Sequence, residues 1–216
     1  MTSILTIWPS GQTELLRKKV DSLLTSDEGQ TKYYGCINED DCGDKDSLIS
    51  KLREEYRRLI DISAIDTTLN IVCVLPLFGK NPLELISRII AATAHSGDSC
   101  SLQFLCLRHS LAAICGDTGT SAPENENPNL LEEIGNLCIN AGFQCSAAPI
   151  DNYIASGASA GFNADSLALY LHTLLRSYME NYGRIFGPSL FSDSRMLALG
   201  LSQVEFPRKR ICRHLL

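Results

Sequence analysis

The chain has 216 residues, of which 44% are hydrophobic and 20% are charged, and this composition is typical of a globular domain and excludes a disordered or fibrous chain. Its formal net charge of −6 argues against general nucleic-acid binding, which needs an excess of Lys and Arg to displace phosphate counterions. No apolar run reaches the roughly 18 residues that span a bilayer, and strand-like residues follow Met1 in place of a signal peptide, so we expect a cytoplasmic protein without membrane insertion.

The first half of the chain alternates strand-like and helical patterns. Residues 3–8 and 32–37 are expected strands. A helix is expected over 13–24, where leucines and a valine at helical spacing predict the inner face: Leu15, Leu16, Val20, Leu23 and Leu24. After an acidic loop, Asp46 or Ser47 is the expected N-cap of the next helix.

The clearest strand covers 70–78, because its continuous β-branched and apolar residues are typical of a strand buried on both faces and therefore central. Asn81 is the expected cap of the following helix, and Pro82 suits its first position. This helix continues to His95, and a further strand is expected over 101–107. A weaker strand pattern covers 110–115.

The second half of the chain continues the alternation of helices and strands. A loop over 116–129 precedes a helix over 130–141, which Gly142 ends, and a strand over 143–150. A second loop leads to the longest helix, expected over 165–182. Residues 196–206 look like strand material, and the basic segment after them has no helix cap, which indicates that the chain is the N-terminal part of a larger protein.

These patterns predict a three-layer, Rossmann-like α/β fold with a mainly parallel sheet flanked by helices, in one domain over residues 1–216. Parallel sheets place ligands beyond the carboxyl ends of their strands. The loops to search therefore follow Trp8, Phe78, Cys115 and Ile150. None contains a Walker or dinucleotide fingerprint. After Trp8, Ser10 and Gly11 offer a hydroxyl and amides at a helix start, where anions bind favourably.

The loop after Cys115 combines small residues that let a backbone approach phosphate oxygens. This stretch resembles the glycine-rich GGGTGTG-type phosphate loop of the tubulin and FtsZ-like GTPases, where a helix and a strand also follow. The residues that match the motif are Gly116, Thr118, Gly119 and Thr120. The resemblance implies GTP binding with Mg²⁺ at these residues, and polymerisation.

Three hypotheses for function follow from these residues. Cys115, Asp117 and Ser121 stand where the motif has glycine, which favours a non-catalytic or degenerate nucleotide-fold module that acts through a protein partner or self-association. The second hypothesis keeps GTP binding. The third is a small hydrolase or transferase with a nucleophile at a strand end, although no serine has the G-x-S-x-G surroundings of a nucleophile elbow.

Several other polar residues have a structural explanation that is simpler than a functional one. Cys36 and Cys42 share a polar region, but no second Cys or His pair at zinc spacing accompanies them. We therefore expect no metal site, and buried cysteines elsewhere as small apolar residues. His172 is expected on a helix face rather than in an acid-base pair with Asp151, and His95 at a helix C-terminus. No catalytic residue is assigned.

Overall fold

The computed structural model describes the polypeptide in ten segments. These are residues 3–9, 13–26, 34–38, 42, 44–62, 69–77, 81–95, 100–107, 129–150 and 164–185. Within the last segment, the side chains described are those of 165, 167–176 and 179. The expected strand over 110–115 and the strand-like residues 196–206 lie outside these segments.

The five strands expected over 3–8, 32–37, 70–78, 101–107 and 143–150 are present, and their ends lie within two residues of the predictions. They are β1 (Ile4–Trp8), β2 (Tyr34–Asn38), β3 (Leu69–Pro76), β4 (Cys100–Leu107) and β5 (Cys145–Ile150). The helices are α1 (Glu14–Ser26), α2 (Lys45–Ile62), α3 (Pro82–His95), α4 (Leu130–Ile139) and α5 (Ala164–Ile185). None of the helices in the described part of the chain combines the length and hydropathy of a membrane span.

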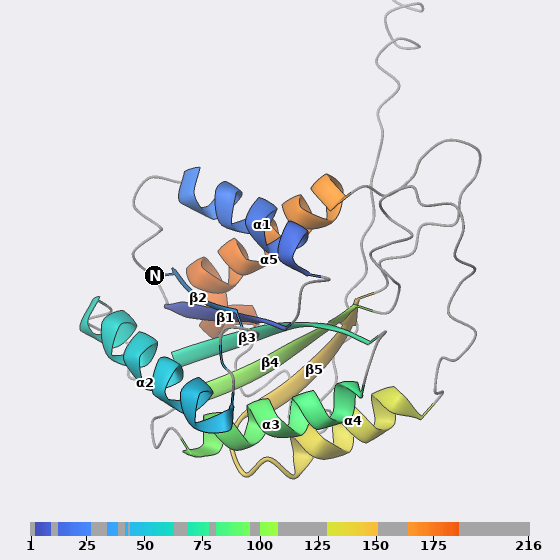
Figure 1. The fold of residues 1–216 in the computed structure, drawn as a ribbon. Coiled ribbons are helices and arrows are strands. Elements are labelled where there is room, and N and C mark those ends of the chain that lie inside the picture. The colour runs from blue at the N-terminus through green and yellow to red at the C-terminus, as the bar shows by residue number, and fades with distance from the viewer. Residues whose placement is uncertain are drawn as a thin grey trace, which may run out of the picture.

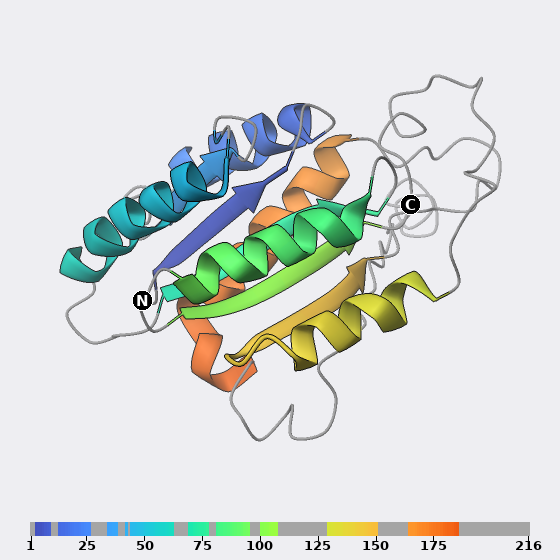
Figure 2. The same cartoon turned by 60° about the horizontal axis from the view of Figure 1, so that its bottom comes forward.

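The five strands form one sheet in the order β2-β1-β3-β4-β5, and every neighbouring pair is parallel. Helices α1 and α5 cover one face of this sheet, and α2, α3 and α4 cover the other (Figures 1 and 2). The predicted three-layer α/β fold is therefore confirmed, and the mainly parallel sheet is parallel throughout. The strand order is the flavodoxin-like order of doubly wound folds.

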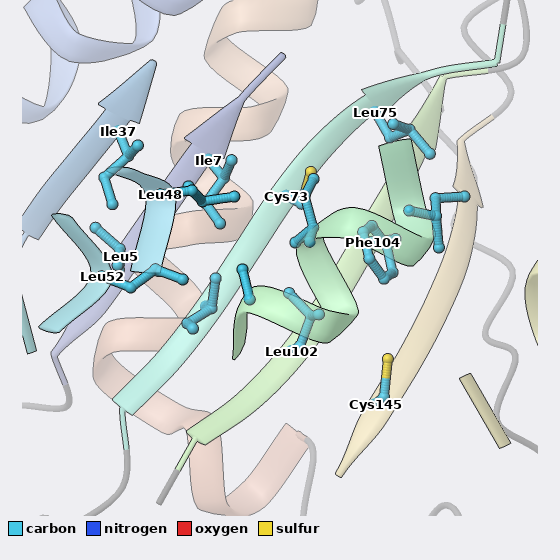
Figure 3. Packing of buried hydrophobic residues seen from close by; sticks show 14 of the residues in the cluster. Leu5, Ile7, Ile37, Leu48, Leu52, Cys73, Leu75, Leu102, Phe104 and Cys145 are labelled. Atoms are coloured by element: carbon cyan, nitrogen blue, oxygen red, sulfur yellow. The ribbon is translucent and has the colours of Figure 1, made fainter. Parts of the chain in front are cut away.

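The central strand β3 is buried at all eight of its residues. This complete burial explains why its sequence is a continuous apolar run. Its side chains alternate between the two faces. On one face, Cys73 and Leu75 join a cluster with β4, α2, α3 and α4 side chains, and Figure 3 shows Phe104 and Leu48 among them. On the other face, Val72 and Val74 belong to the cluster beneath α1 and α5.

The start of α2 differs from the sequence prediction. The helix begins at Lys45, and the Asp44 carboxylate accepts a hydrogen bond from the backbone N–H of Ser47 at 2.8 Å. Asp44 is thus the N-cap, and the expectation of Asp46 or Ser47 was wrong. Any of the Asp and Ser residues in this stretch suits a cap, and the packing of Leu48 and Leu52 into the core sets where the helix starts.

Both ends of α3 agree with the sequence. Pro82 is its first residue, and the backbone carbonyl of Asn81 accepts from the Leu85 N–H at 3.4 Å, while the Asn81 side chain donates to Glu84. At the other end, Arg53 of α2 donates to the His95 carbonyl at 2.9 Å. A cation at this position satisfies a terminal carbonyl and suits the helix dipole.

Candidate functional site

The strand order places the topological switch point between β1 and β3, because the chain proceeds from β1 to its neighbour β2 and then crosses to β3 on the other side. Ligands of doubly wound folds bind beyond the carboxyl ends of the strands at such a point. At this edge, the last described residues are Trp8 and Pro9 after β1, Pro76 and Leu77 at the end of β3, and Leu107 at the end of β4. The Leu77 N–H donates to the Leu107 carbonyl at 2.9 Å, so β3 and β4 stay paired to this edge.

The six residues predicted to bind a ligand all lie outside the described segments. Ser10 and Gly11 belong to the connection from β1 to α1, beside the switch point, and Gly116, Thr118, Gly119 and Thr120 belong to the connection from β4 to α4. Both connections leave from the carboxyl edge of the sheet and lead to a helix N-terminus. Their role in binding remains a prediction.

The described residues on either side of the connection that contains Ser10 and Gly11 are held together. Thr13 is fully buried, and its hydroxyl donates to the Pro9 carbonyl at 2.7 Å. The Thr13 carbonyl in turn accepts the Arg17 N–H at 2.8 Å, the first hydrogen bond of α1. Both ends of the short connection are therefore fixed relative to β1 and α1.

A polar network lies beneath α1, and sequence analysis missed it. The Thr6 hydroxyl accepts from the Trp8 indole N–H at 3.0 Å and lies 2.9 Å from the Tyr34 hydroxyl. The Tyr34 hydroxyl donates to Asp21 at 2.7 Å, and Asp21 pairs with Arg17 at 3.1 Å. The network ties α1 to β1 and β2. The sequence signal was a threonine inside the apolar run of β1, where an unpaired hydroxyl would be costly.

The network does not activate the neighbouring thiol. Burial raises the pKa of Cys36, and the Asp21 carboxylate adds to this rise. Burial likewise raises the pKa of Tyr34 well above its ordinary value. The thiols of Cys73 on β3 and Cys106 on β4, in the core beneath α2, α3 and α4, also have raised pKa values because of burial. Because the thiolate is the nucleophilic form, these three cysteines are poor nucleophiles at neutral pH.

Cys36 and Cys42 lie on opposite faces of the sheet. Cys36 packs against the cluster beneath α1 and α5, whereas Cys42 belongs to the cluster under α2 and its thiol lies 3.7 Å from the Asn38 carbonyl. Within the described segments, no group of three or more Cys, His, Asp or Glu residues is arranged to hold a metal ion. Cys73, Cys106, Cys138 and Cys145 are buried, as the sequence predicts.

The two predicted histidine positions are as expected, within the limits of the described chain. His95 is the last residue of α3, with its Nδ1 atom 2.7 Å from the Ala91 carbonyl. His172 is half-buried on α5. Its proposed acid-base partner Asp151 lies outside the described segments, so that pairing is not tested.

The outward surface of the α1 and α5 layer carries two exposed leucines. Leu15 is 52% exposed and Leu169 is 56% exposed. The sequence prediction that Leu15 belongs to the inner face of α1 was wrong. Leu16 and Val20 take that face, and a residue one position away lies about 100° round the helix. The Lys19 ammonium pairs with the Asp165 carboxylate and joins α1 to α5. Leu15 precedes Lys19 by four residues on α1, and Leu169 follows Asp165 by four residues on α5, so each leucine lies about one helical turn from a member of this pair.

We call this surface the α1–α5 face and define it by six residues that are all exposed. On α1 and α5 they are Leu15, Lys18, Asp165, Leu169, Thr173 and Arg176. The four α5 members follow each other at spacings of three or four residues and so form one stripe along that helix. Two apolar side chains thus stand within a charged and polar surround.

A scan of the sequence against protein-family models finds no match, and neither does a search of curated proteins.

Proposed function

We propose that this chain is a non-catalytic α/β module, with the topology of nucleotide-binding folds, that acts through protein contacts made by the α1–α5 face. The observation that carries the proposal is the exposure of Leu15 and Leu169 on one helical layer. Contact surfaces commonly have an apolar centre and a polar rim. Burying the exposed half of each leucine would contribute about 1 kcal/mol to association.

The state of the thiols supports a non-catalytic role over a thiol nucleophile. Cys36, Cys73 and Cys106 have raised pKa values because of burial, whereas catalytic cysteines have lowered ones. In the described part of the chain, Cys36, Cys73 and Cys106 are free thiols. Free thiols persist in reducing compartments, which supports the cytoplasmic location that we propose for this module.

Site-specific photo-crosslinking in the cells that produce the chain tests the contact surface. A benzophenone side chain would replace Leu15 or Leu169 on the α1–α5 face, and Arg57, an exposed residue of α2 in the opposite layer, would be the matched control. We expect crosslinked protein from the two leucine positions and none from the control. Equal crosslinking from all three positions, or none from the leucines, would contradict the proposal.

A second candidate function is guanine-nucleotide binding at the carboxyl edge of the sheet. The observation that favours it is the strand order, because the switch point lies next to the connection that holds Ser10 and Gly11. In this function, Gly116, Thr118, Gly119 and Thr120 would hold the phosphates of GTP, and Mg²⁺ would come from solution. The resemblance of these four residues to the tubulin and FtsZ-like loop supplies the choice of nucleotide.

Thermal unfolding with and without Mg·GTP tests this second function. A ligand at 100 times its dissociation constant stabilises a protein by about 2.7 kcal/mol, so binding predicts a rise in the melting temperature that Mg·ATP does not reproduce. Thr118→Ala would reduce that rise. An unchanged melting temperature with GTP would remove the candidate, and GTP hydrolysis that Thr118→Ala abolishes would contradict the non-catalytic role.

A further inference from the structure

We infer that the α1–α5 face binds a second copy of this chain, in a two-fold dimer in which α5 packs antiparallel against α5 of the partner subunit. This inference rests on the proposed function and adds the identity of the partner. The order of residues along the exposed stripe of α5 supports such a dimer: Asp165, Leu169, Thr173 and Arg176.

Among the side chains that the structure describes, the first member of the stripe is acidic and the last is basic. Asp165 lies in the first turn of α5, and Arg176 lies 11 residues later, about 16 Å along the helix axis. A two-fold axis perpendicular to the helix reverses the stripe, so Asp165 of each copy would face the partner subunit's Arg176. Both contacts form together, because a two-fold interface repeats every contact.

The same arrangement brings the exposed leucines together. With Asp165 opposite the partner's Arg176, the two Leu169 side chains lie three residues apart along the axis, which is about 4.5 Å. They would pack against each other at the centre of the contact, between the two ion pairs. A parallel pairing would instead place Asp165 beside the partner's Asp165 and Arg176 beside the partner's Arg176, so repulsion between like charges disfavours it.

Asp165 can accept a second cation. Although it pairs with Lys19, its side chain remains 70% exposed. Helix α1 lies alongside α5 in the same layer (Figure 1), and its exposed Leu15 widens the surface available to the partner. The structure therefore offers an apolar centre, flanking opposite charges and a second helix beside α5 for self-association.

Charge reversal in separate chains tests the dimer. In Asp165→Arg, both ion pairs of the homodimer become Arg–Arg contacts, and in Arg176→Glu both become Asp–Glu contacts. Mixing the two variants restores opposite charges at both contacts of the heterodimer. Any change within one chain, including loss of the Lys19 pair, is the same alone and in the mixture, so only contacts between copies can produce the recovery.

The readout is the mass in solution, measured by sedimentation on the full chain over a range of concentrations. We expect twice the 23.7 kDa of one chain for the native protein, dimer dissociation constants raised at least about tenfold for each variant alone, and recovery on mixing. Glu132→Arg, at an exposed first-turn position of α4 in the opposite layer, is the matched control and should leave the dimer unchanged.

Two outcomes overturn the inference: a native chain that stays monomeric at every concentration, or a dimer that both charge reversals leave intact. Circular dichroism checks that the variants fold, and Asp165→Asn with Arg176→Gln provides a milder pair if a reversal impairs folding. Crosslinks from Leu15 and Leu169 to a different protein, with a monomeric native chain, would retain the proposed function and remove the dimer. Absence of crosslinks from both leucines would remove both.

Discussion

The Thr6 hydroxyl connects more of the structure than any other single polar group in the network beneath α1. It receives the indole N–H of Trp8, lies within hydrogen-bond distance of the Tyr34 hydroxyl, and donates to the Gly35 carbonyl at 3.2 Å. Both Thr6 and Trp8 are buried. A buried donor that loses its acceptor costs more than an average hydrogen bond contributes.

We therefore expect Thr6→Val, which keeps the shape of the side chain, to lower the free energy of unfolding by about 1–3 kcal/mol, because it leaves the Trp8 indole N–H without its acceptor. Urea unfolding followed by the fluorescence of Trp8, the single tryptophan, measures the change. Thr6→Ser keeps the hydroxyl and loses one methyl group, so it should be the less destabilising of the two. A valine variant as stable as the native chain would show that the network contributes nothing.

At the scale of the elements, the helix ends depend on contacts between elements as well as on local caps. Arg53 joins α2 to the last turn of α3, and Lys19 joins α1 to α5. The start of α2 depends on Asp44, whose carboxylate accepts the Ser47 N–H and whose carbonyl accepts the Leu48 N–H at 3.2 Å. Since Leu48 is buried, the cap at Asp44 and the packing of α2 into the core support the same helix start.

Removing this cap by Asp44→Ala should destabilise the protein by about 1 kcal/mol, since an N-cap carboxylate satisfies a backbone N–H that is otherwise unpaired. Denaturant unfolding followed by far-ultraviolet circular dichroism provides the measurement. Asp44→Asn retains an acceptor oxygen and should stay close to the native stability. The cap assignment fails if alanine and asparagine at this position give the same stability, or if Asp46→Ala has the larger effect.

At the scale of the whole molecule, the fold holds thiols and a phenol away from water on both faces of the sheet. The pKa values of Cys36, Cys73, Cys106 and Tyr34 are all raised in the folded state, with burial as the largest cause. In the unfolded chain these thiols ionise near their ordinary pKa of 9.0. The unfolded state thus loses protons at a lower pH than the folded state does.

The free energy of unfolding should consequently be constant with respect to these thiols below pH 9.0 and fall as the pH rises above it. Each such thiol steepens the decline by up to about 1.4 kcal/mol per pH unit. Urea unfolding under reducing conditions, repeated from neutral to alkaline pH, measures the slope. Cys73→Ala should make the decline less steep by the contribution of one thiol, although it also lowers the stability at neutral pH. An unchanged slope would contradict the assignment of a raised pKa to Cys73.

The predicted ligand site is the part of the molecule about which the sequence still says more than the structure. Ser10, Gly11, Gly116, Thr118, Gly119 and Thr120 were chosen from loop position, residue type and a family resemblance, and all lie outside the described segments. The strand order adds that the first two follow β1 at the switch point. The α1–α5 face, by contrast, could not be predicted from the sequence, because the spacing of Leu15 is that of an inward-facing leucine of an amphipathic helix.

The sequence by itself determined the five strands, the five helices and the burial of Cys73 and Cys106, because these depend on local runs and periodicities that a chain shows before it folds. The tertiary structure decided the strand order, the cap at Asp44, the Thr6–Tyr34–Asp21 network and the outward position of Leu15. Each of these depends on which residues meet across the sheet and its helices. These contacts are set by the packing of the whole core. A local pattern can mark a residue such as Thr6 within an apolar strand, but it does not identify the partner of that residue.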